Sequence, residues 1–274
     1  HKKGHNVIIY IQQPDFIDDS IKQFLCKDIK IYSWCNNWFL RFFLWRINGL
    51  TQKIFNFSIV EFLNNYKIKR VIKSFKPEII NSQMSYSDFL IARSIKTMKS
   101  KSFKFIVSTH GEYEIKIIDT IKATIVINIC DGIIGGSYRN LEYIKKNFLH
   151  LNKPTKIIRV GFSETLKPSN NYSKKDLKIP NNEIVIGMVA RGIPEKGWEE
   201  LILAFHKYNS LYNNSTLLLI GKSQYLSSII KKHYHSKILH LVLNNSMDFL
   251  KYLNIIDIGV LPTYFPGESF PNIL

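Results

Sequence analysis

Short runs of apolar, β-branched residues alternate along this chain with longer stretches in which apolar residues recur at helical spacing. The runs are apolar at consecutive positions, which is typical of parallel strands buried between two layers of helices. Helical spacing predicts helices at 87–100 and 138–148, with Ser87 and Ser137 as their N-caps. In this first part of the chain, the predicted strands are 6–11, 29–34, 77–83, 103–110, 124–129 with the glycine-rich 132–137, and 155–161.

A polar segment rich in Ser, Asn, Lys and Pro, residues 163–183, interrupts this pattern and is predicted to be a linker. Beyond it, strands are predicted at 184–191, 215–221, 237–243 and 257–263, and helices at 197–212, 224–235 and 246–256. Two successive strand–helix series predict an α/β fold of two Rossmann-like parallel-sheet domains facing a central cleft. We expect the first domain at 1–164 and the second at 165–274.

Composition narrows the class of protein. A length of 274 residues fits two domains, and 45% hydrophobic residues exclude a disordered chain. The three scattered cysteines favour ordinary thiols in a reducing compartment. No apolar run approaches the ~20 residues of a spanning helix. The formal net charge of +17 favours a polyanionic partner such as nucleic acid, anionic lipid or a phosphorylated ligand, although biased codon usage would explain it as well.

The two ends of the chain look cut. It opens at His1 rather than Met, directly before a strand, and stops at Leu274, three residues after the expected start of a helix at Pro271. We expect no signal peptide in this sequence. We therefore expect both ends of the fold to be truncated.

The segment 187–205 carries the clearest candidate chemistry. A buried strand delivers Arg191 to the carboxyl edge of the second sheet, where ligands of such sheets bind, and Lys196 follows just before a helix. An Arg fork, a Lys charge and helix amides together suit a diphosphate. Two surface cations in an ordinary strand–helix loop are the alternative.

A second candidate lies near the end of the chain. Glu268 follows a buried strand and a loop, and Ser269 with Pro271 is a favoured start for a helix. A carboxylate there can hold sugar hydroxyls or balance positive charge in a transition state. Alternatively, Glu268 caps its own helix.

Taken together, the two segments resemble the retaining glycosyltransferases of family four, the glycosyl transferases group 1 set with GT-B architecture. The family's GR-x-x-x-x-KG turn is similar to Ala190-Arg191 through Lys196-Gly197. Its P-S-x-x-E-G-F-P-x-x-x-x-E signature is similar to Pro262-Thr263 followed by Glu268-Ser269-Phe270-Pro271. More weakly, 75–83, 108–114 and 160–164 resemble segments of the family's first domain.

The resemblance implies transfer of a sugar from a nucleotide-diphospho-sugar to a glycan or lipid-linked acceptor, with retention of configuration. This chemistry belongs to cell-surface polysaccharide or lipopolysaccharide synthesis at the cytoplasmic membrane face. No cofactor is expected, because the nucleotide sugar is a substrate, and no metal is expected, because the departing phosphate would help to deprotonate the acceptor. The implied site residues are Arg191 and Lys196 for the donor diphosphate, Glu268 and His110 for catalysis, and Ser269, Phe270 and Pro271 for the donor sugar.

His110 and the missing segments qualify this reading. His110 closes the predicted strand 103–110, and in the family a histidine there contacts the donor sugar; a packed side chain is the alternative. The family's second glutamate would fall beyond Leu274, and its glycine-rich loop would precede His1. Ser269 replaces the commoner glycine.

Residues 37–47 combine aromatic residues with Arg41 and Arg46. They fit either a core helix with extended arginines or a helix in a membrane interface, so an anionic membrane surface is an expected further partner. Residues 15–19 are predicted to be a solvated loop, and His233 with His235 lacks the partners of a zinc site. Two rival functions remain. One is a nucleotide-sugar epimerase on the same fold, and the other is a basic binding module for nucleic acid or anionic lipid. The binding module ranks last because the sequence lacks RNA-binding aromatic motifs, and no nucleic acid partner is expected.

Overall fold

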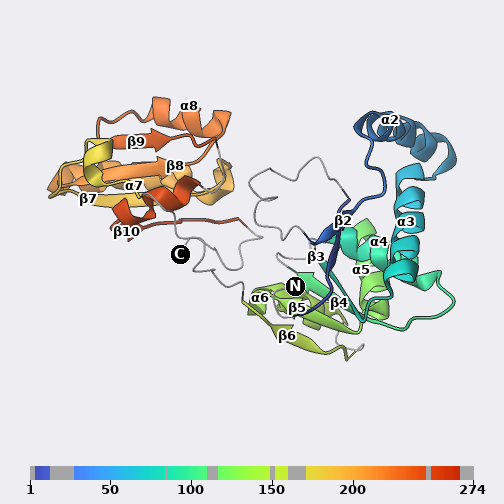
Figure 1. The fold of residues 1–274 in the computed structure, drawn as a ribbon. Coiled ribbons are helices and arrows are strands. Elements are labelled where there is room, and N and C mark those ends of the chain that lie inside the picture. The colour runs from blue at the N-terminus through green and yellow to red at the C-terminus, as the bar shows by residue number, and fades with distance from the viewer. Residues whose placement is uncertain are drawn as a thin grey trace. The chain divides into compact units, whose positions relative to one another are not determined.

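The computed structural model describes residues 4–12, 28–83, 85–109, 117–148, 152–159, 171–244 and 248–265. The chain divides into two compact units, His1–Arg159 and Val160–Leu274, each with its own sheet and core (Figure 1). The predicted boundary at 164/165 falls among residues outside the described part and stays a prediction. The predicted cleft between the two sheets also stays a prediction.

The first unit is built on a four-stranded parallel sheet in the order β3–β4–β5–β6. Its strands are β3 (Ile79–Gln83), β4 (Lys104–Thr109), β5 (Gly132–Gly135) and β6 (Thr155–Ile157). The two strands predicted first, β1 (Ile8–Tyr10) and β2 (Lys30–Tyr32), form a separate parallel pair. All six are shorter than or shifted from the predicted ranges.

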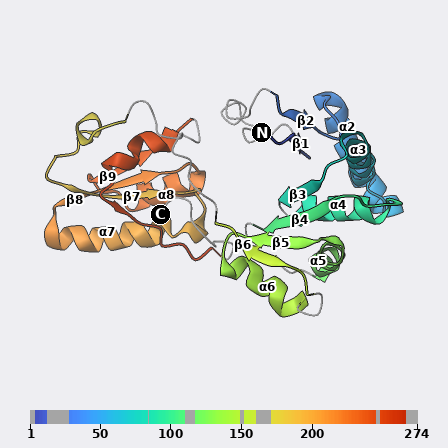
Figure 2. The ribbon, with the colours of Figure 1, turned by 60° about the horizontal axis from the view of Figure 1, so that its bottom comes forward.

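Five described helices accompany these strands (Figure 2). They are α2 (Trp38–Phe55), α3 (Ile59–Phe75), α4 (Ser85–Lys96), α5 (Ile117–Ile129) and α6 (Tyr138–Phe148). The prediction of α6 is confirmed to the residue, and the Ser137 hydroxyl accepts a hydrogen bond from the Asn140 amide at 3.3 Å, as an N-cap does. The prediction of Ser87 as an N-cap is wrong, because α4 already includes Ser85.

The strand predicted at 124–129 is wrong, because these residues form the last part of α5. Their β-branched composition favours a strand, but the buried positions are Ala123, Val126, Ile127 and Cys130, which is helical spacing. The actual strand, β5, follows at the glycine-rich 132–135 and pairs with β4. Tertiary packing therefore overrides local propensity here.

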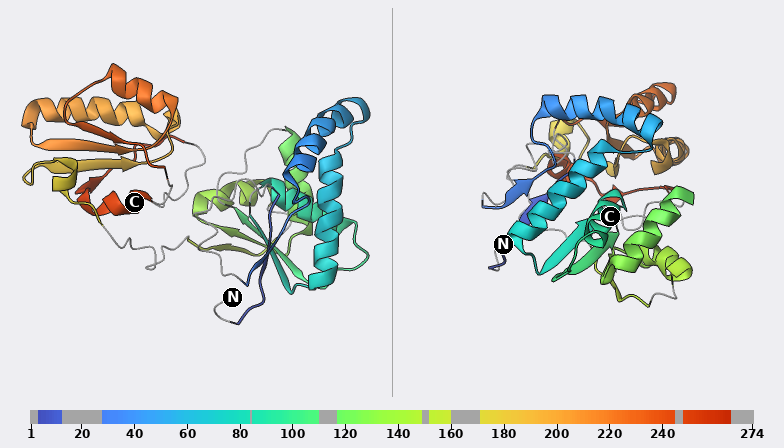
Figure 3. Two further views of the ribbon diagram at one scale, coloured as in Figure 1. Left: turned by 45° about the horizontal axis from the view of Figure 1, so that its top comes forward. Right: turned by 90° about the vertical axis from the view of Figure 1, so that its right-hand side faces the viewer.

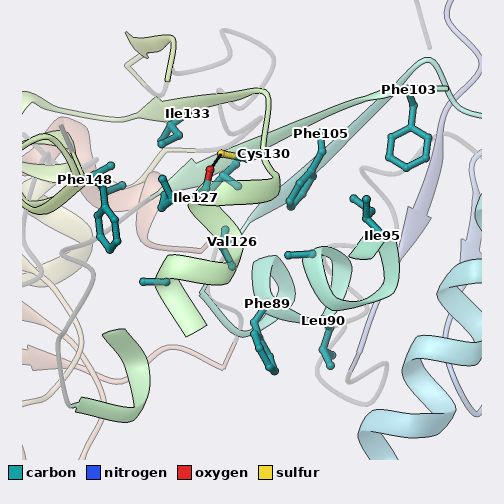
Figure 4. Packing of buried hydrophobic residues seen from close by; sticks show 14 of the residues in the cluster. Phe89, Leu90, Ile95, Phe103, Phe105, Val126, Ile127, Cys130, Ile133 and Phe148 are labelled. Carbon is teal, nitrogen blue, oxygen red and sulfur yellow. Dashed lines mark hydrogen bonds between the residues drawn. The ribbon is translucent and has the colours of Figure 1, made fainter. Parts of the chain in front are cut away.

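The core of the first unit lies between β4 and the helices α4 and α5. Figure 4 shows Phe105 of β4 with Phe89 and Leu90 of α4 and Val126 and Ile127 of α5. Cys130 closes α5 with its thiol 3.4 Å from the carbonyl oxygen of Ile127. Burial raises the pKa of this thiol to about 11, so it stays protonated and inert at neutral pH.

The second unit has a four-stranded parallel sheet in the order β10–β7–β8–β9. Its strands are β7 (Ile184–Val189), β8 (Ser215–Ile220), β9 (Ile238–Leu241) and β10 (Ile258–Gly259). Helices α7 (Trp198–Tyr212) and α8 (Gln224–Lys232) cover one face, and 3-10 helices η4 (Lys174–Leu177) and η6 (Asp248–Ile255) lie on the other (Figure 3). Every residue of β8 is buried, as the apolar run predicts.

Two predictions for this unit need correction. The predicted linker 163–183 is in part a folded segment, since η4 lies within it and Ile179 is buried in the core of the unit. The side chain of Lys174 also binds the Asp257 carboxylate at 2.8 Å and lowers its pKa, which ties η4 to the start of β10. The helix predicted at 246–256 is a 3-10 helix over its described residues.

Candidate functional site

The turn after β7 is anchored beneath Arg191. β7 ends at Val189, and the exposed side chain of Arg191 follows at the carboxyl edge of the sheet. The Arg191 carbonyl oxygen accepts hydrogen bonds from the Ile193 amide at 2.8 Å and the buried Trp198 indole at 2.9 Å. Because both donors are fixed by a turn and a helix, the position of the Arg191 backbone is closely defined.

Lys196 ends a short 3-10 helix, η5 (Pro194–Lys196), directly before α7. The next residue, Gly197, has φ +79°, and a Cβ there would clash with the carbonyl oxygen of Pro262. The carbonyl of Glu195 accepts hydrogen bonds from the Tyr264 amide at 3.0 Å and the Thr263 hydroxyl at 3.2 Å. The two sequence motifs of the second unit are therefore side by side in the fold.

Arg191 and Lys196 are the two residues predicted to bind the diphosphate, and their cationic groups lie close to the same aromatic ring. The guanidinium carbon of Arg191 is 5.2 Å from the centre of the Phe265 ring, and Lys196 Nζ is 5.0 Å from the same centre. Both distances are in the range of cation–π contacts, which offset part of the cost of holding two positive charges together. Arg191 is exposed whereas Lys196 is only 7% exposed, so the pair offers one accessible fork and one nearly buried point charge.

A second glycine turn supports this loop from the side. A Cβ at Gly192 would clash with the Ser223 side chain, and a Cβ at Gly221 would come within 2.9 Å of the Trp198 ring. Ser223 caps α8 by accepting the Leu226 amide at 2.9 Å. The turns after β7 and β8 thus interlock, and the N-terminus of α8 reaches the same sheet edge, where helix amides favour anions.

In the first unit, the last residue of β4 at the carboxyl edge of the sheet directly precedes His110 in the sequence. β4 ends at Thr109, and the side chains of Asn81 and Ser108 hydrogen-bond between β3 and β4 with Nδ2 and Oγ at 3.0 Å. Ser82 donates a hydrogen bond to the buried carboxylate of Asp88. His110 itself lies outside the described residues, so its catalytic role stays a prediction.

Four further predicted site residues, Glu268, Ser269, Phe270 and Pro271, also lie outside the described residues. The described part of this motif ends at Phe265. Sequence reasoning missed Phe265 and Trp198. Each of these aromatic residues lies within a sequence motif already singled out, and this was the only available signal. Their contacts could not be predicted, because they depend on the tertiary fold.

Among the described residues, no group of three or more His, Cys, Asp or Glu side chains is placed to hold a metal ion. His233, considered for zinc from the sequence, instead contacts the Glu199 carboxylate at 2.7 Å, and this carboxylate also binds Lys232. His235 packs edge-on against Phe205 and His206. These histidines have structural partners.

Comparison with known proteins bears on the second unit first. Residues 169–274 match the sequence model of the family described as Glycosyl transferases group 1. The chain is also 27% identical over 194 residues to the capsular polysaccharide biosynthesis glycosyltransferase CapM of Staphylococcus aureus. That alignment covers 66% of this chain and 47% of CapM, so the chain spans about half the length of this curated relative.

Solved structures match most of the chain. A glycosyltransferase from Rickettsia africae matches 97% of it with a TM-score of 0.64 at 18% identity, over 67% of its own length. HepE of Anabaena in complex with UDP-glucose matches 94% with a TM-score of 0.63 at 14% identity, over 73% of its own length. This likeness shows the fold, an α/β chain with parallel sheets that matches GT-B glycosyltransferases. The match to the glycosyl transferases group 1 family covers residues 169–274, which lie within the second unit.

Proposed function

We propose that this chain is part of a glycosyltransferase that moves a sugar from a nucleotide-diphospho-sugar to a glycan or lipid-linked acceptor in cell-surface polysaccharide synthesis. The observation that carries the proposal is the meeting of Arg191 and Lys196 at Phe265, beside the Pro262–Phe265 segment. The family of the second unit and the similarity to CapM support the reaction class. The complex of HepE with UDP-glucose makes UDP-glucose the first donor to test.

The proposed reaction breaks the bond between the sugar C1 and the diphosphate oxygen and forms a bond from an acceptor oxygen to C1 on the same face. The electron pair of the broken bond leaves with the diphosphate, whose added negative charge Arg191 and Lys196 neutralise. The departing phosphate oxygen takes the proton of the acceptor hydroxyl. Glu268, the backbone of Ser269–Pro271 and His110 hold the sugar ring in this proposal. Protein cations carry out the neutralisation, and the scheme requires no metal ion.

Titration calorimetry with UDP tests the diphosphate role of the cation pair. Arg191→Ala removes a charge-assisted contact worth about 1.5–3 kcal/mol, so UDP affinity should fall roughly tenfold or more. Lys231→Ala, a change of an exposed cation on α8, is the matched control and should leave the affinity unchanged. Equal affinities for Arg191→Ala and the unchanged protein would exclude this diphosphate site.

The kinetic arm tests the sugar contact of Glu268. Glu268→Gln should lower kcat for transfer by a much larger factor than it lowers UDP affinity, because the expected partner of the carboxylate is the sugar in the transition state. Sugar transfer is measured as label incorporated into the acceptor, and any released free sugar is identified by NMR. UDP release with an altered free sugar and no labelled acceptor would instead identify an epimerase. A loss of stability by about 1 kcal/mol with unchanged kcat would mean that Glu268 only caps its helix.

A further inference from the structure

Two polar residues of helix α2 lie on its inner side. Arg41 and Asn48, seven residues apart, are the two buried residues of this helix. Arg41 Nη1 donates a hydrogen bond to the Cys35 carbonyl at 2.7 Å. Asn48 Oδ1 accepts from the Ser58 hydroxyl at 2.9 Å and from the Val60 amide at 3.1 Å, at the start of α3. These contacts fix which side of α2 faces the protein.

The outer side of the same helix is mostly apolar, with the exposed Arg46 and Lys53 among its apolar residues. Phe39, Phe43, Leu50 and Ile54 share one face by their spacing and are between 54% and 71% exposed. Within the first unit, α2 lies beside α3 and away from the four-stranded sheet (Figures 1 and 3). We call the exposed apolar surface of this helix the α2 face; it comprises Trp38, Phe39, Leu40, Phe42, Phe43, Trp45, Leu50, Ile54 and Phe55. Large exposed apolar surfaces mark interaction sites.

Cations are interleaved with these aromatic residues. Helix α2 contains no Asp or Glu, and the guanidinium of Arg46 lies 4.9 Å from the centre of the Phe42 ring. Residues 37–76, which include α2 and α3, hold eight Lys or Arg and one Glu. That Glu, Glu61, binds Arg93. The exposed charged residues of α2 itself, Arg46 and Lys53, are therefore all positive.

This combination selects among partners for the α2 face. A second copy of the chain would bring Arg46 and Lys53 of both copies together, which costs electrostatic energy. An anionic bilayer matches both properties, because apolar rings enter the acyl boundary while Arg and Lys meet the headgroups. In the described part of the chain, no helix is long and apolar enough to cross a bilayer. A helix with this face would therefore lie in the plane of the surface.

We propose that α2 is an interfacial helix that binds the first unit to the surface of an anionic phospholipid bilayer through the α2 face. Apolar burial supplies the larger part of the affinity, and Arg46 and Lys53 supply the preference for anionic lipid. The inference rests on the first unit and does not depend on the proposed sugar transfer.

Vesicle flotation of the whole protein, without any sugar donor, tests it. The protein should float with phosphatidylcholine–phosphatidylglycerol vesicles and much less with phosphatidylcholine alone. The double change Phe39→Ser/Phe43→Ser should lower the partition coefficient roughly tenfold or more, because two exposed rings no longer enter the lipid. The matched control is Leu211→Ser/Tyr212→Ser, two comparably exposed residues of α7 in the second unit, and should bind as the unchanged protein does.

The charge change Arg46→Gln/Lys53→Gln should reduce partitioning onto the anionic vesicles about tenfold or more and leave the weak binding to neutral vesicles unchanged. Circular dichroism checks that each variant stays folded. Unchanged flotation of Phe39→Ser/Phe43→Ser would overturn the inference, because vesicle binding would then be due to the overall charge of the protein. A dimer in light scattering that the same double change abolishes, with no vesicle binding, would also overturn it. Neither result would bear on UDP binding, which is measured separately.

Discussion

Gly197 illustrates how one residue joins two motifs. Its φ of +79° is a conformation that L side chains rarely adopt, and its missing Cβ leaves room for the Pro262 carbonyl. This close approach lies next to Lys196, whose Nζ is 5.0 Å from the centre of the Phe265 ring. The family motif therefore has a steric reason for glycine at this place.

Gly197→Ala should destabilise the second unit by about 2 kcal/mol or more, because backbone strain at positive φ adds to the clash with Pro262. UDP affinity should fall as well, since Lys196 would shift away from Phe265. Gly49→Ala is the control, because it adds a methyl group in open space within α2 and should stabilise that helix by roughly 0.5–1 kcal/mol. Urea unfolding and calorimetry measure the two effects. An unaltered UDP affinity of Gly197→Ala would separate the turn from the binding site.

The candidate site was predictable only in part at this scale. Arg191 and Lys196 follow from the strand–turn–helix pattern, since a buried strand places the next residues at the sheet edge. The ring that both cations share was not predictable. Phe265 reaches them through the hydrogen bonds of Glu195 to Thr263 and Tyr264, which bring together residues about 70 positions apart.

At the scale of elements, α6 and α5 show what sequence patterns can and cannot predict. Helix α6 has mixed polar and apolar residues and a Ser N-cap, so periodicity and propensity agree and the prediction was confirmed. Helix α5 has a β-branched sequence, so propensity and periodicity conflict, and the prediction of a strand at 124–129 was wrong. Where the two signals disagree, the buried spacing decides the structure.

The junction of α2 and α3 depends on Asn48, whose carboxamide oxygen accepts two hydrogen bonds from the start of α3. Asn48→Ala would leave the buried Val60 amide without this acceptor, so stability should fall by about 1–3 kcal/mol. Gln52→Ala, an exposed change in the same helix, should alter it by less than about 0.5 kcal/mol. Urea unfolding of the three proteins makes the comparison. Equal losses for both variants would mean that the junction is held by apolar packing alone.

At the scale of the whole molecule, the described hydrophobic clusters do not cross between the units. The cluster around Phe105 and Val126 belongs to the first unit, and those around Trp198 and Leu218 belong to the second. Separate cores are typical of domains that can unfold separately. The positive charge is also divided unequally, because the first unit holds 26 Lys and Arg against 12 Asp and Glu, whereas the second holds 12 against 9.

Phe105→Ala should destabilise the first unit by about 3–5 kcal/mol, because it leaves a cavity beside Val126 and Ile127. We expect urea unfolding followed by circular dichroism to show two transitions, and this change should lower the midpoint urea concentration of only one of them. Added UDP should raise the midpoint of only the other transition, since binding stabilises the unit that carries the site. A single transition that shifts as a whole in both experiments would contradict independent unfolding.

The composition of α5 has a consequence for what happens when the first unit opens. In the folded unit, Val126 and Ile127 are buried in a helix, and neighbouring packing maintains that conformation. Released from it, residues 124–130 are an uncharged, β-branched stretch without proline, the kind of segment that pairs with copies of itself. Heated solutions of the protein should therefore precipitate at a rate that rises with concentration. Changes that weaken the first unit, such as Phe105→Ala, should reduce the yield of recovered protein before any loss of binding is seen.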